Sequence, residues 1–529
     1  MRCSNCGTDN AADAAFCMSC GTSLSSVKSP QPKTQLSSRP QVLLNLRRLL
    51  VVLGTIAVLV FAVVAVRLLT ARQASIAITP KLIISQSERS GLVLQAMDLS
   101  GATKPLQLAP QPNLDLNGLS VDRGAYQGTL PQRQQWALSQ AYISPDGRYG
   151  LLAVKETGAW TLLRFDLDNG EPLEFLRDAQ AIQVLVNAFD SRFIAQATTR
   201  RGRNVQTGDL AAGSLTTLIE DADETSAWPG ADWQHVAYAS RDGSNSVHYV
   251  ADIDGRQSRA LIASSASAPV TDNGRHVYYS VDDTLYRRSM DGGLPEPLTA
   301  GRGGSLSVYD LSAQRDRLLV IAAAGGTSDL QLLRNDGSER ASLARGVKSI
   351  KGATFSGDGQ HLLVWTNETD GDSLLLFDGR GQSQRTVFRG AQSAVVQWLA
   401  DNRFLYAVRE RDGLTALYAE SVDGKDSKRL LEGFQRLDQV ASDAAGYLAI
   451  AGTKDGKSLV YTMKPGQAQP QLIDETKGRF ASVWLAPGGR VVYQTDDGGR
   501  SSIYVADNDG KNRRLLADNA TIVAANLYR

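Results

Sequence analysis

The chain has 529 residues, 42% of them hydrophobic, and a formal net charge of +1. This length predicts more than one domain. The small net charge hides an asymmetry, because residues 1–72 contain eight Lys and Arg against two Asp and Glu, which leaves the remainder mildly acidic. An acidic body argues against a nucleic-acid-binding surface there. We therefore expect a membrane, and no nucleic acid, to account for the basic N-terminal arm.

The cysteines are confined to the first 20 residues, and the rest of the chain contains none. This excludes a large secreted domain held together by disulfides. The spacing C-x2-C-x10-C-x2-C, with a glycine after each pair, suits a tetrahedral Zn²⁺ site made of four thiolates. Disulfides, a redox dithiol and an iron–sulfur cluster are the alternatives. We predict one structural zinc ion in residues 1–24, bound by Cys3, Cys6, Cys17 and Cys20.

A long apolar stretch follows this cysteine module. Residues 25–46 are rich in Ser, Pro, Gln and Lys without an acidic residue, which is typical of a flexible basic linker. From Leu49 to Val66 every residue is apolar, Gly or Thr, and this stretch measures about 27 Å as a helix. We expect residues 47–70 to form a single transmembrane helix. A cleaved signal peptide, which usually has a shorter apolar region, and a buried soluble helix are the alternatives.

Flanking charge predicts the orientation of this helix. Five Lys and Arg residues precede it within residues 28–48, whereas Arg67, Arg72 and Lys81 follow it. Positive charge favours the cytosolic side of a membrane, and zinc thiolates persist best in a reducing compartment. We therefore expect the N-terminus in the cytosol and residues 71–529 outside the cell membrane.

Residues 71–529 form a repeat array. Each module of about 43 residues contains four apolar strands separated by tight turns, many of them Asp-Gly, which suits hairpins that need positive φ. Four antiparallel strands in such a module form one blade of a β-propeller. Each module contains the same pattern, a turn followed by an Arg or a similar residue and then an apolar strand. The residue after the turn marks each module, and successive markers are 41–44 residues apart. The markers are Arg148, Arg192, Gln234, Arg275, Arg317, Gln360, Arg403, Tyr447 and Arg490.

These repeats predict an all-β fold of about ten four-stranded blades, in one ring or in two smaller rings. The first module begins at its second strand, near Lys81–Ser85, and an insertion at about residues 109–135 separates it from the next. The segment Val523–Tyr528 has the pattern and the position of an innermost strand. We expect this segment to complete the first blade, because closing the ring removes its exposed sheet edges.

Two family resemblances follow from these motifs. Residues 1–7 and 16–21 resemble the short N-terminal zinc ribbons of bacterial membrane proteins, although Ser4 stands where those ribbons often carry Pro. The repeats resemble the TolB-like, WD-type propeller family, which implies the fold. Such propellers mostly serve as binding platforms and occasionally accompany a peptidase domain. The best matches are Ser144–Arg148, Ser356–Gln360 and Ile503–Gly510.

Other polar motifs are better explained by the repeats than by chemistry. The Asp-Gly pairs at Asp242, Asp254, Asp336 and Asp423 are isolated, whereas a calcium loop needs several oxygen ligands at short intervals. We interpret them as hairpin turns. Of the four histidines, three begin equivalent strands, which favours a repeat effect over a metal or catalytic cluster. The histidines are His235, His248, His276 and His361.

The tryptophans are spread through the blades. Trp398 and Trp484 fall in predicted innermost strands, where packing between blades is expected. Trp228 and Trp233 flank a turn, where we expect packing, with a ligand surface as the alternative.

The sequence contains no G-x-S-x-G nucleophile motif, and no α/β segment follows the repeats. We therefore expect no enzyme, but a membrane-anchored binding or scaffold protein whose propeller takes a protein, peptide or glycan. An extracytoplasmic propeller hydrolase or lyase, with residues from scattered loops, is the first alternative. A transmembrane signal sensor is the second.

Overall fold

A computed structural model of the chain defines the fold of its repeat region. All described residues belong to the second of the two units into which the chain divides, Ser75–Arg529. The structure describes residues 80–88, 91–106, 136–138, 141–156, 158–187, 191–229, 233–242, 245–256, 258–263, 270–271, 275–290, 293–300, 304–312, 316–399, 402–410, 412–443 and 445–527.

Several predictions concern residues outside these ranges. They include the zinc ribbon at residues 1–24, the linker at 25–46, the helix at 47–70 and the insertion at 109–135. Within the described ranges, no helix is long and apolar enough to cross a membrane.

All regular elements of the described residues are β-strands, and they pair antiparallel in nine sheets. The first three sheets in chain order are built from the strands that follow. The first contains β1 (Lys81–Glu88), β2 (Gly91–Asp98), β3 (Thr103–Pro105) and β40 (Ala520–Ala525). The second contains β5 (Ala141–Ile143), β6 (Tyr149–Glu156), β7 (Ala159–Asp166) and β8 (Pro172–Ala179). The third contains β4 (Trp136–Leu138), β9 (Ala181–Asn187), β10 (Arg192–Thr198), β11 (Arg203–Asp209) and β12 (Ser214–Ala222).

The next three sheets have four strands each. The fourth contains β13 (Glu224–Pro229), β14 (His235–Asp242), β15 (Asn245–Asp252) and β16 (Arg259–Ala263). The fifth contains β17 (Val270–Thr271), β18 (His276–Val281), β19 (Thr284–Ser289) and β20 (Glu296–Ala300). The sixth contains β21 (Ser305–Leu311), β22 (Arg317–Ala324), β23 (Thr327–Arg334) and β24 (Arg340–Val347).

The seventh sheet has seven strands, because one long strand joins two four-stranded units. It contains β25 (Ser349–Phe355), β26 (His361–Glu368), β27 (Gly371–Asp378), β28 (Gln384–Trp398), β29 (Arg403–Arg409), β30 (Thr415–Ser421) and β31 (Ser427–Phe434). The first half of β28 pairs with β27 and the second half with β29. The eighth contains β32 (Arg436–Ser442), β33 (Leu448–Lys454), β34 (Lys457–Met463) and β35 (Gln471–Thr476). The ninth contains β36 (Arg479–Leu485), β37 (Val491–Asp497), β38 (Arg500–Ala506) and β39 (Arg514–Asp518).

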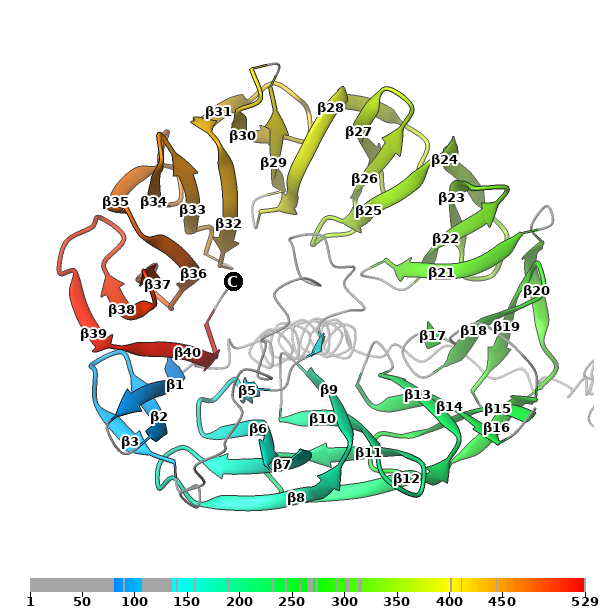
Figure 1. Ribbon diagram of the computed structural model, residues 1–529. Coiled ribbons are helices and arrows are strands. Elements are labelled where there is room, and N and C mark those ends of the chain that lie inside the picture. Colours follow the sequence, from blue (N-terminus) through cyan, green and yellow to red (C-terminus); the bar gives the residue numbers. More distant parts are fainter. Residues whose placement is uncertain are drawn as a thin grey trace, which may run out of the picture. The chain divides into compact units, whose positions relative to one another are not determined.

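The sheets follow one another around a ring (Figure 1). Each sheet contacts the next in chain order, and β38 of the ninth sheet contacts β40 of the first, so the circuit closes. The nine predicted markers lie at the first residue of the second strand of a module, or one residue before it. The repeat period therefore located the modules correctly.

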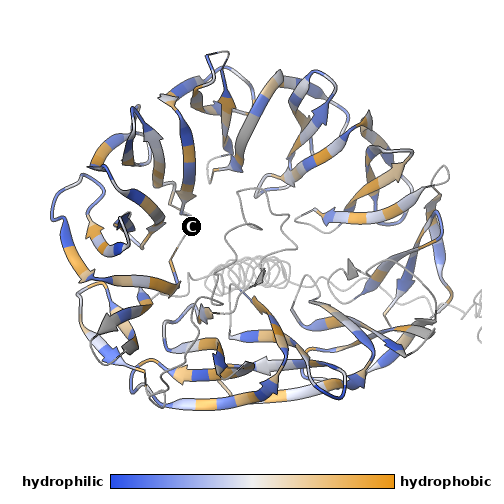
Figure 2. Cartoon of the chain, in the orientation of Figure 1, coloured by the Kyte–Doolittle hydropathy of each residue, from blue (hydrophilic) through white to orange (hydrophobic). Residues whose placement is uncertain are grey.

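The hydrophobic core lies between neighbouring sheets, because the side chains of a strand alternate between its two faces. Both faces of an inner strand are therefore apolar, as in Leu151–Val154 of β6, and Figure 2 shows hydrophobic residues on strands all around the ring. In β1, Ile83 packs in a cluster with residues of the second sheet, such as Leu152 and Phe165. Its neighbours Leu82 and Ile84 pack in another cluster with residues of the ninth sheet. All three β1 side chains have no exposed surface.

Arginine side chains add polar contacts between successive modules. Arg164 of β7 donates from Nε to the carbonyl of Leu210 at 2.5 Å. Between the fifth and sixth sheets, Arg287 of β19 donates in the same way to the carbonyl of Asn335 at 3.0 Å. Each accepting carbonyl lies in the turn after the third strand of the next module. A guanidinium has several donors in a fixed fork, so it can satisfy turn carbonyls that the sheet leaves unpaired.

The ring closes through pairing between the two ends of the described chain. β40 pairs antiparallel with β1, with Ile84 opposite Ile522, and completes the first sheet at its inner edge. The backbone N–H of Lys81 donates to Asn526 Oδ1 at 2.7 Å, and the Asn526 N–H donates to the Lys81 carbonyl at 3.3 Å. The predicted closure by the C-terminal segment is confirmed, with the strand at Ala520–Ala525.

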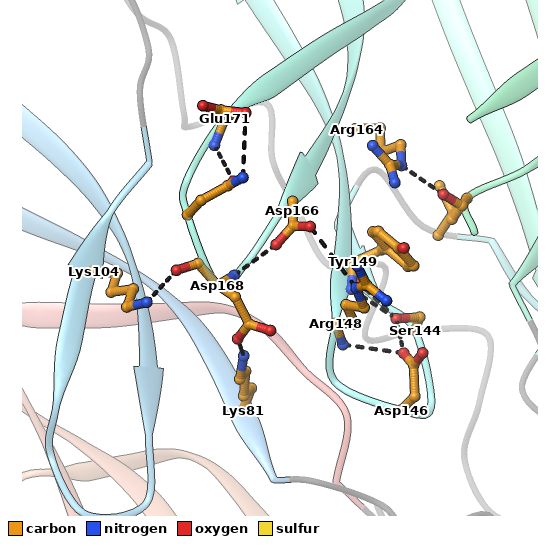
Figure 3. Close-up of polar contacts among 12 residues, drawn as sticks. Lys81, Lys104, Ser144, Asp146, Arg148, Tyr149, Arg164, Asp166, Asp168 and Glu171 are labelled. Carbon is orange, nitrogen blue, oxygen red and sulfur yellow. Dashed lines mark hydrogen bonds and ion pairs between the residues drawn. The ribbon is translucent and has the colours of Figure 1, made fainter. Parts of the chain in front are cut away.

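Lys81 also ties this first sheet to the second (Figure 3). Its Nζ donates to Asp168 Oδ1 at 2.5 Å, and Lys104 of β3 donates to the Asp168 carbonyl. The hydrogen bond from Lys81 is the main reason that the pKa of Asp168 lies below its usual value. The Asp168 side chain is 66% exposed, so this ion pair contributes no more than about 1 kcal/mol to stability. Apolar packing therefore contributes more than this ion pair to the contact between the first and second sheets.

Deletion of residues 520–529 is expected to lower the melting temperature sharply and to cause association. It removes the buried Ile522 and Val523, each worth about 1.5–3 kcal/mol, and leaves the inner edge of β1 unpaired. Thermal unfolding and light scattering of the purified protein measure both effects. Deletion of residues 528–529 alone, which lie after β40, is the control. If the variant that lacks residues 520–529 has the same melting temperature as the full chain, closure by β40 is contradicted.

Candidate functional site

A cleft of about 520 Å³ lies between the fifth and sixth sheets, where β22 turns into β23. Ala300 at the end of β20 lines one side, and residues of the sixth sheet line the other. The volume lies within the usual range of small-molecule sites. The lining residues are Ala300, Gly304, Ala322, Ala323, Ala324, Thr327, Asp329, Gln331, Arg340, Ser342 and Arg345.

Small residues make room for this cleft. The same face of the sixth sheet begins with Leu318 and Val320, which are buried in the hydrophobic cluster shared with the fifth sheet. Further along β22 the side chains shrink to Ala322 and Ala324, so the space between the sheets is not filled. A Cβ at Gly304 would lie 2.1 Å from the Ala323 carbonyl oxygen. A larger residue there would displace the end of β22.

The polar wall of the cleft comes from alternate residues of β23 and β24. Thr327, Asp329 and Gln331 share one face of β23, because strand side chains alternate. Ser342 of β24 lies opposite Gln331 in the register. The pairing shifts further along, between Ser328 and Leu330, which is where β24 supplies Arg345. A β-bulge of this kind redirects side chains and is frequent near active sites.

Hydrogen bonds fix two of these groups. The Gly346 N–H donates to Asp329 Oδ1 at 2.7 Å, and Arg345 Nε donates to Ser342 Oγ at 2.8 Å. Gly346 has φ of 59°, a left-handed conformation that glycine adopts without strain. The backbone therefore holds one oxygen of the Asp329 carboxylate and leaves the other for a ligand.

Other groups of the wall are available to a ligand. Within the described part of the chain, the Arg340 side chain forms no hydrogen bond, and neither it nor the Arg345 side chain forms an ion pair with Asp329. The Oε1 atom of Gln331 is buried and lacks a hydrogen-bond partner among the described residues. Because this atom is buried, a ligand in the cleft cannot reach it. The wall that a ligand can contact thus combines two guanidinium groups and one carboxylate.

Sequence reasoning missed this cleft. The predicted metal ligands Cys3, Cys6, Cys17 and Cys20 lie outside the described residues, and no predicted residue lines the cleft. One signal was present in the sequence: the run Ala322–Gly326, three alanines and two glycines, replaces the large apolar residues expected near a strand end. Whether these small residues leave a cleft depends on which sheet packs against them, and the sequence does not show this.

Among the described residues, no group of three or more His, Cys, Asp or Glu side chains could hold a metal ion. His235, His276 and His361 each begin the second strand of a module, which confirms the repeat interpretation. His248 on β15 is only 4% exposed, and its Nδ1 has no hydrogen-bond partner in the described region. Burial lowers the pKa of this imidazole.

The Asp-Gly pairs at Asp254, Asp336 and Asp423 form turns, as predicted, whereas Gly243 of the fourth pair lies outside the described residues. Gly255, Gly337 and Gly424 have φ between 72° and 81°. In each turn the preceding aspartate accepts a backbone N–H two residues later, as Asp336 does from Ser338 at 2.9 Å. This pattern is an Asx-turn.

The tryptophans pack between modules. Trp398 of β28 donates from Nε1 to the Thr354 carbonyl at 3.0 Å, and Trp484 of β36 is buried. Trp233 is also buried, at 4% exposure, which excludes the ligand-surface alternative for that residue. The side chain of Trp228 lies outside the described part.

Comparisons with known proteins agree with the predicted zinc ribbon and with the predicted propeller fold. Residues 2–24 match the family model of a zinc-ribbon domain, so the predicted ribbon is confirmed at the level of its family. A search of curated proteins found no match to the chain. Among solved structures, the chain is similar to TolB and to other β-propellers.

Three solved structures illustrate this likeness. A putative TolB from Agrobacterium tumefaciens is 18% identical, with 42% of this chain and 84% of that chain covered and a TM-score of 0.27. Dipeptidyl peptidase 4 from Porphyromonas gingivalis is 15% identical, with 61% and 51% covered and a TM-score of 0.36. The propeller domain of the Trilobed protease from Pyrococcus furiosus is 13% identical, with 56% and 97% covered and a TM-score of 0.34. The chain thus spans about half the length of the dipeptidyl peptidase, and the likeness concerns the fold.

The comparisons contradict the expectation of a non-enzymatic binding or scaffold protein. The similar structures include a prolyl endopeptidase, puromycin-hydrolysing peptidases and an oligogalacturonate lyase, which are 13–14% identical to this chain and share its fold. The sequence argument failed for a physical reason. The lack of a G-x-S-x-G motif and of an α/β segment excludes only one kind of hydrolase domain. Residues that a propeller brings together from separate strands leave no such local signature.

Acid is expected to destabilise the propeller through His248. Because its folded pKa lies below the unfolded value of about 6.5, the unfolded state binds the proton first. The contribution of the neutral His248 to the free energy of unfolding is then fully present above about pH 6.5 and decreases as the pH falls towards the folded pKa. Between pH 7.5 and pH 5, the melting temperature of His248→Leu should fall less than that of the wild type. Val247→Ala, a non-titrating change on the same strand, is the control and should keep the wild-type pH dependence. An unchanged pH dependence in His248→Leu would refute this role.

Proposed function

We propose that the chain is a propeller enzyme, a hydrolase or a lyase, and that the cleft between the fifth and sixth sheets is its substrate site. The observation that carries this proposal is the polar wall on β23 and β24. It combines the Asp329 carboxylate with the guanidinium groups of Arg340 and Arg345 in one cleft. A second supporting feature is the fixed position of Asp329, which the Gly346 N–H holds at 2.7 Å.

These groups suit acid–base chemistry. A carboxylate with one oxygen held by the backbone can accept a proton through the other, from an attacking water in hydrolysis or from a C–H group in elimination. Attack of water on a peptide or ester carbonyl, and removal of a C–H proton next to a carboxyl group, both build negative charge on the substrate. Guanidinium groups stabilise such charge without giving up a proton, since arginine remains charged in proteins. Asp329 is therefore the proposed proton acceptor, and Arg340 and Arg345 are the proposed electrostatic groups.

Asp329→Asn should reduce turnover by about 10²–10⁴-fold, the usual contribution of a general base. The amide keeps the size of the side chain and its acceptor for Gly346, so the fold should be unchanged. The full chain, purified in detergent, is first screened on peptide, glycan and ester substrates to find an activity. The loss is then measured as kcat on the best substrate.

Asp336→Asn is the matched control, because Asp336 lies in the turn after β23, outside the cleft, and Asn also forms Asx-turns. It should retain wild-type turnover. Absence of turnover on all three substrate classes, or equal rates for the two variants, would count against the proposed function.

We further propose that the modules form a single ring of ten blades. The seven-stranded sheet supports this count, because β28 serves as the outer strand of one four-stranded unit and the inner strand of the next. The contact circuit from each sheet to the next supports one ring rather than two.

For the N-terminal module we propose one structural zinc ion bound by Cys3, Cys6, Cys17 and Cys20. The donor set supports this assignment. Four thiolates in two C-x2-C pairs match the tetrahedral sulfur coordination that zinc prefers, and they leave no open position for a substrate. The ion would then stabilise the fold of the ribbon and take no part in the reaction.

Elemental analysis of the full chain in reducing buffer should find one zinc per chain. Because zinc supplies about 10–16 kcal/mol of folding free energy to such modules, Cys17→Ser should lose the metal and unfold the ribbon. Ser19→Ala, between the same two cysteines, should retain the metal. A zinc content near zero in the wild type would exclude the assignment.

We also propose that residues 47–70 anchor the chain in the cell membrane, with the N-terminus in the cytosol and the propeller outside. The charge bias around the apolar stretch supports this orientation. Protease added to intact cells or spheroplasts should then digest the propeller and spare an N-terminal tag, with digestion of both after lysis as the control. Digestion of the tag alone in intact cells would reverse the orientation.

A further inference from the structure

We infer that two interfaces of the ring carry matched sets of polar side chains that let each module accept only its own neighbour. The first interface joins the two modules of the seventh sheet, β25–β27 with the first half of β28 and the second half of β28 with β29–β31. The second joins the eighth and ninth sheets. Each set consists of a tyrosine, an acid and an arginine. The modules that supply the acid and the arginine are exchanged between the two interfaces.

In the seventh sheet the acid belongs to the following module and the arginine to the preceding one. The Tyr406 hydroxyl on β29 donates to Glu420 Oε2 at 3.0 Å, and Ser427 Oγ donates to the same atom at 3.2 Å. Arg385, on the first half of β28, donates to Glu420 Oε1 across the interface. The Glu420 side chain is only 7% exposed. It therefore needs this cation, because an unpaired buried charge is costly.

Between the eighth and ninth sheets the acid belongs to the preceding module and the arginine to the following one. The Tyr493 hydroxyl on β37 donates to Asp474 Oδ2 on β35 at 2.8 Å across the interface. Arg513, which directly precedes β39, donates from Nε to the Tyr493 hydroxyl oxygen at 2.8 Å and pairs with Asp474 at 3.0 Å. The Asp474 side chain is 14% exposed. The acid–arginine pair thus crosses this interface in the opposite direction.

The two tyrosines occupy equivalent places in the repeat. Tyr406 and Tyr493 each lie three residues after the marker of their module. Each stacks on a tyrosine of the third strand, Tyr418 or Tyr504, with ring centroids 5.2 and 5.5 Å apart. Burial raises the pKa of both Tyr406 and Tyr493 above the usual value, so each hydroxyl keeps its proton and donates to the acid. The charges around the two hydroxyls can therefore be compared directly.

The exchange of charges disfavours one wrong pairing of modules. Repeat proteins misassemble when similar modules pair out of order, and like charges across an interface act against the wrong partner. If the ninth sheet packed on the first module of the seventh, Arg385 and Arg513 would come together. No carboxylate would separate them, because Ala506 has the strand position that Glu420 has in the other module.

A second wrong pairing is disfavoured in the same way. If the second module of the seventh sheet packed on the eighth sheet, Asp474 and Glu420 would meet at the Tyr406 hydroxyl. A tyrosine hydroxyl donates one hydrogen bond, so one of the two carboxylates would lose its donor beside a like charge. Only the native order of modules places an acid against an arginine at both interfaces.

Exchanging the acid and the arginine at the second interface separates correct assembly from stability. Asp474→Arg alone brings two guanidinium groups together and should lower the melting temperature of the full chain in detergent. Asp474→Arg/Arg513→Glu should recover most of this loss, because an acid again meets an arginine. The ninth sheet then also fits the first module of the seventh. The share of misassembled chains after refolding from urea should rise at least about tenfold, a factor that like charges at an interface readily supply.

Misassembled chains are those that elute as oligomers in size-exclusion chromatography with light scattering, or that lack the native melting transition. Asp474→Asn/Arg513→Gln removes both charges without reversing them and should also raise this share. The matched control is Arg500→Asp/Asp518→Arg, which exchanges an exposed ion pair within the ninth sheet. It should leave the share of misassembled chains at the wild-type value.

Each outcome decides. A wild-type share of misassembled chains in the exchanged and the neutral variants would overturn the inference, because the two sets would then only stabilise the ring. An equal rise in the control would assign the effect to surface charge and overturn it as well. If the exchanged variant does not recover its melting temperature, the share measured for the neutral variant decides alone.

Discussion

The pairing of β40 with β1 is the interaction on which the rest of the ring depends. It joins backbone groups of Lys81 and Asn526, which are 445 residues apart in the chain. Every sheet buries one face against the preceding module and the other against the next, so a missing contact exposes two faces at once. Closure thereby gives Leu82, Ile83 and Ile84 partners on both sides. A ring without free edges also lacks the unpaired strands that promote aggregation.

The cleft is a local departure from the packing that holds the ring together. Between most neighbouring sheets, large aliphatic side chains are buried in shared hydrophobic clusters. On β22 the same face changes from Leu318 and Val320 to Ala322 and Ala324, and on β23 from Leu333 to Gln331 and Asp329. The apolar half keeps the fifth and sixth sheets together, while the polar half stays open. Apolar packing and the proposed ligand site thus occupy opposite ends of one interface.

The positions of the charged groups follow from strand geometry rather than from any sequence motif. Asp329 and Gln331 are two residues apart and so share a face, whereas Arg345 reaches that face only because the pairing of β23 and β24 shifts by a bulge. The glycine at position 346 allows the left-handed backbone of the bulge and supplies the N–H that holds Asp329. One irregularity therefore positions both the carboxylate and a guanidinium.

The sequence by itself determined the module boundaries, the propeller class, the turn positions and the closing strand. These features are encoded locally, since Asp-Gly turns and two-residue alternation specify a strand from its own residues. It also located the zinc-ribbon cysteines, whose spacing is a local signature. Only the tertiary structure revealed the cleft at Asp329, Gln331 and Arg340, because a site between two sheets depends on which faces meet. The same reason explains why the lack of a local hydrolase motif was no guide to catalysis: groups contributed by separate strands come together only when packing brings them into one cleft.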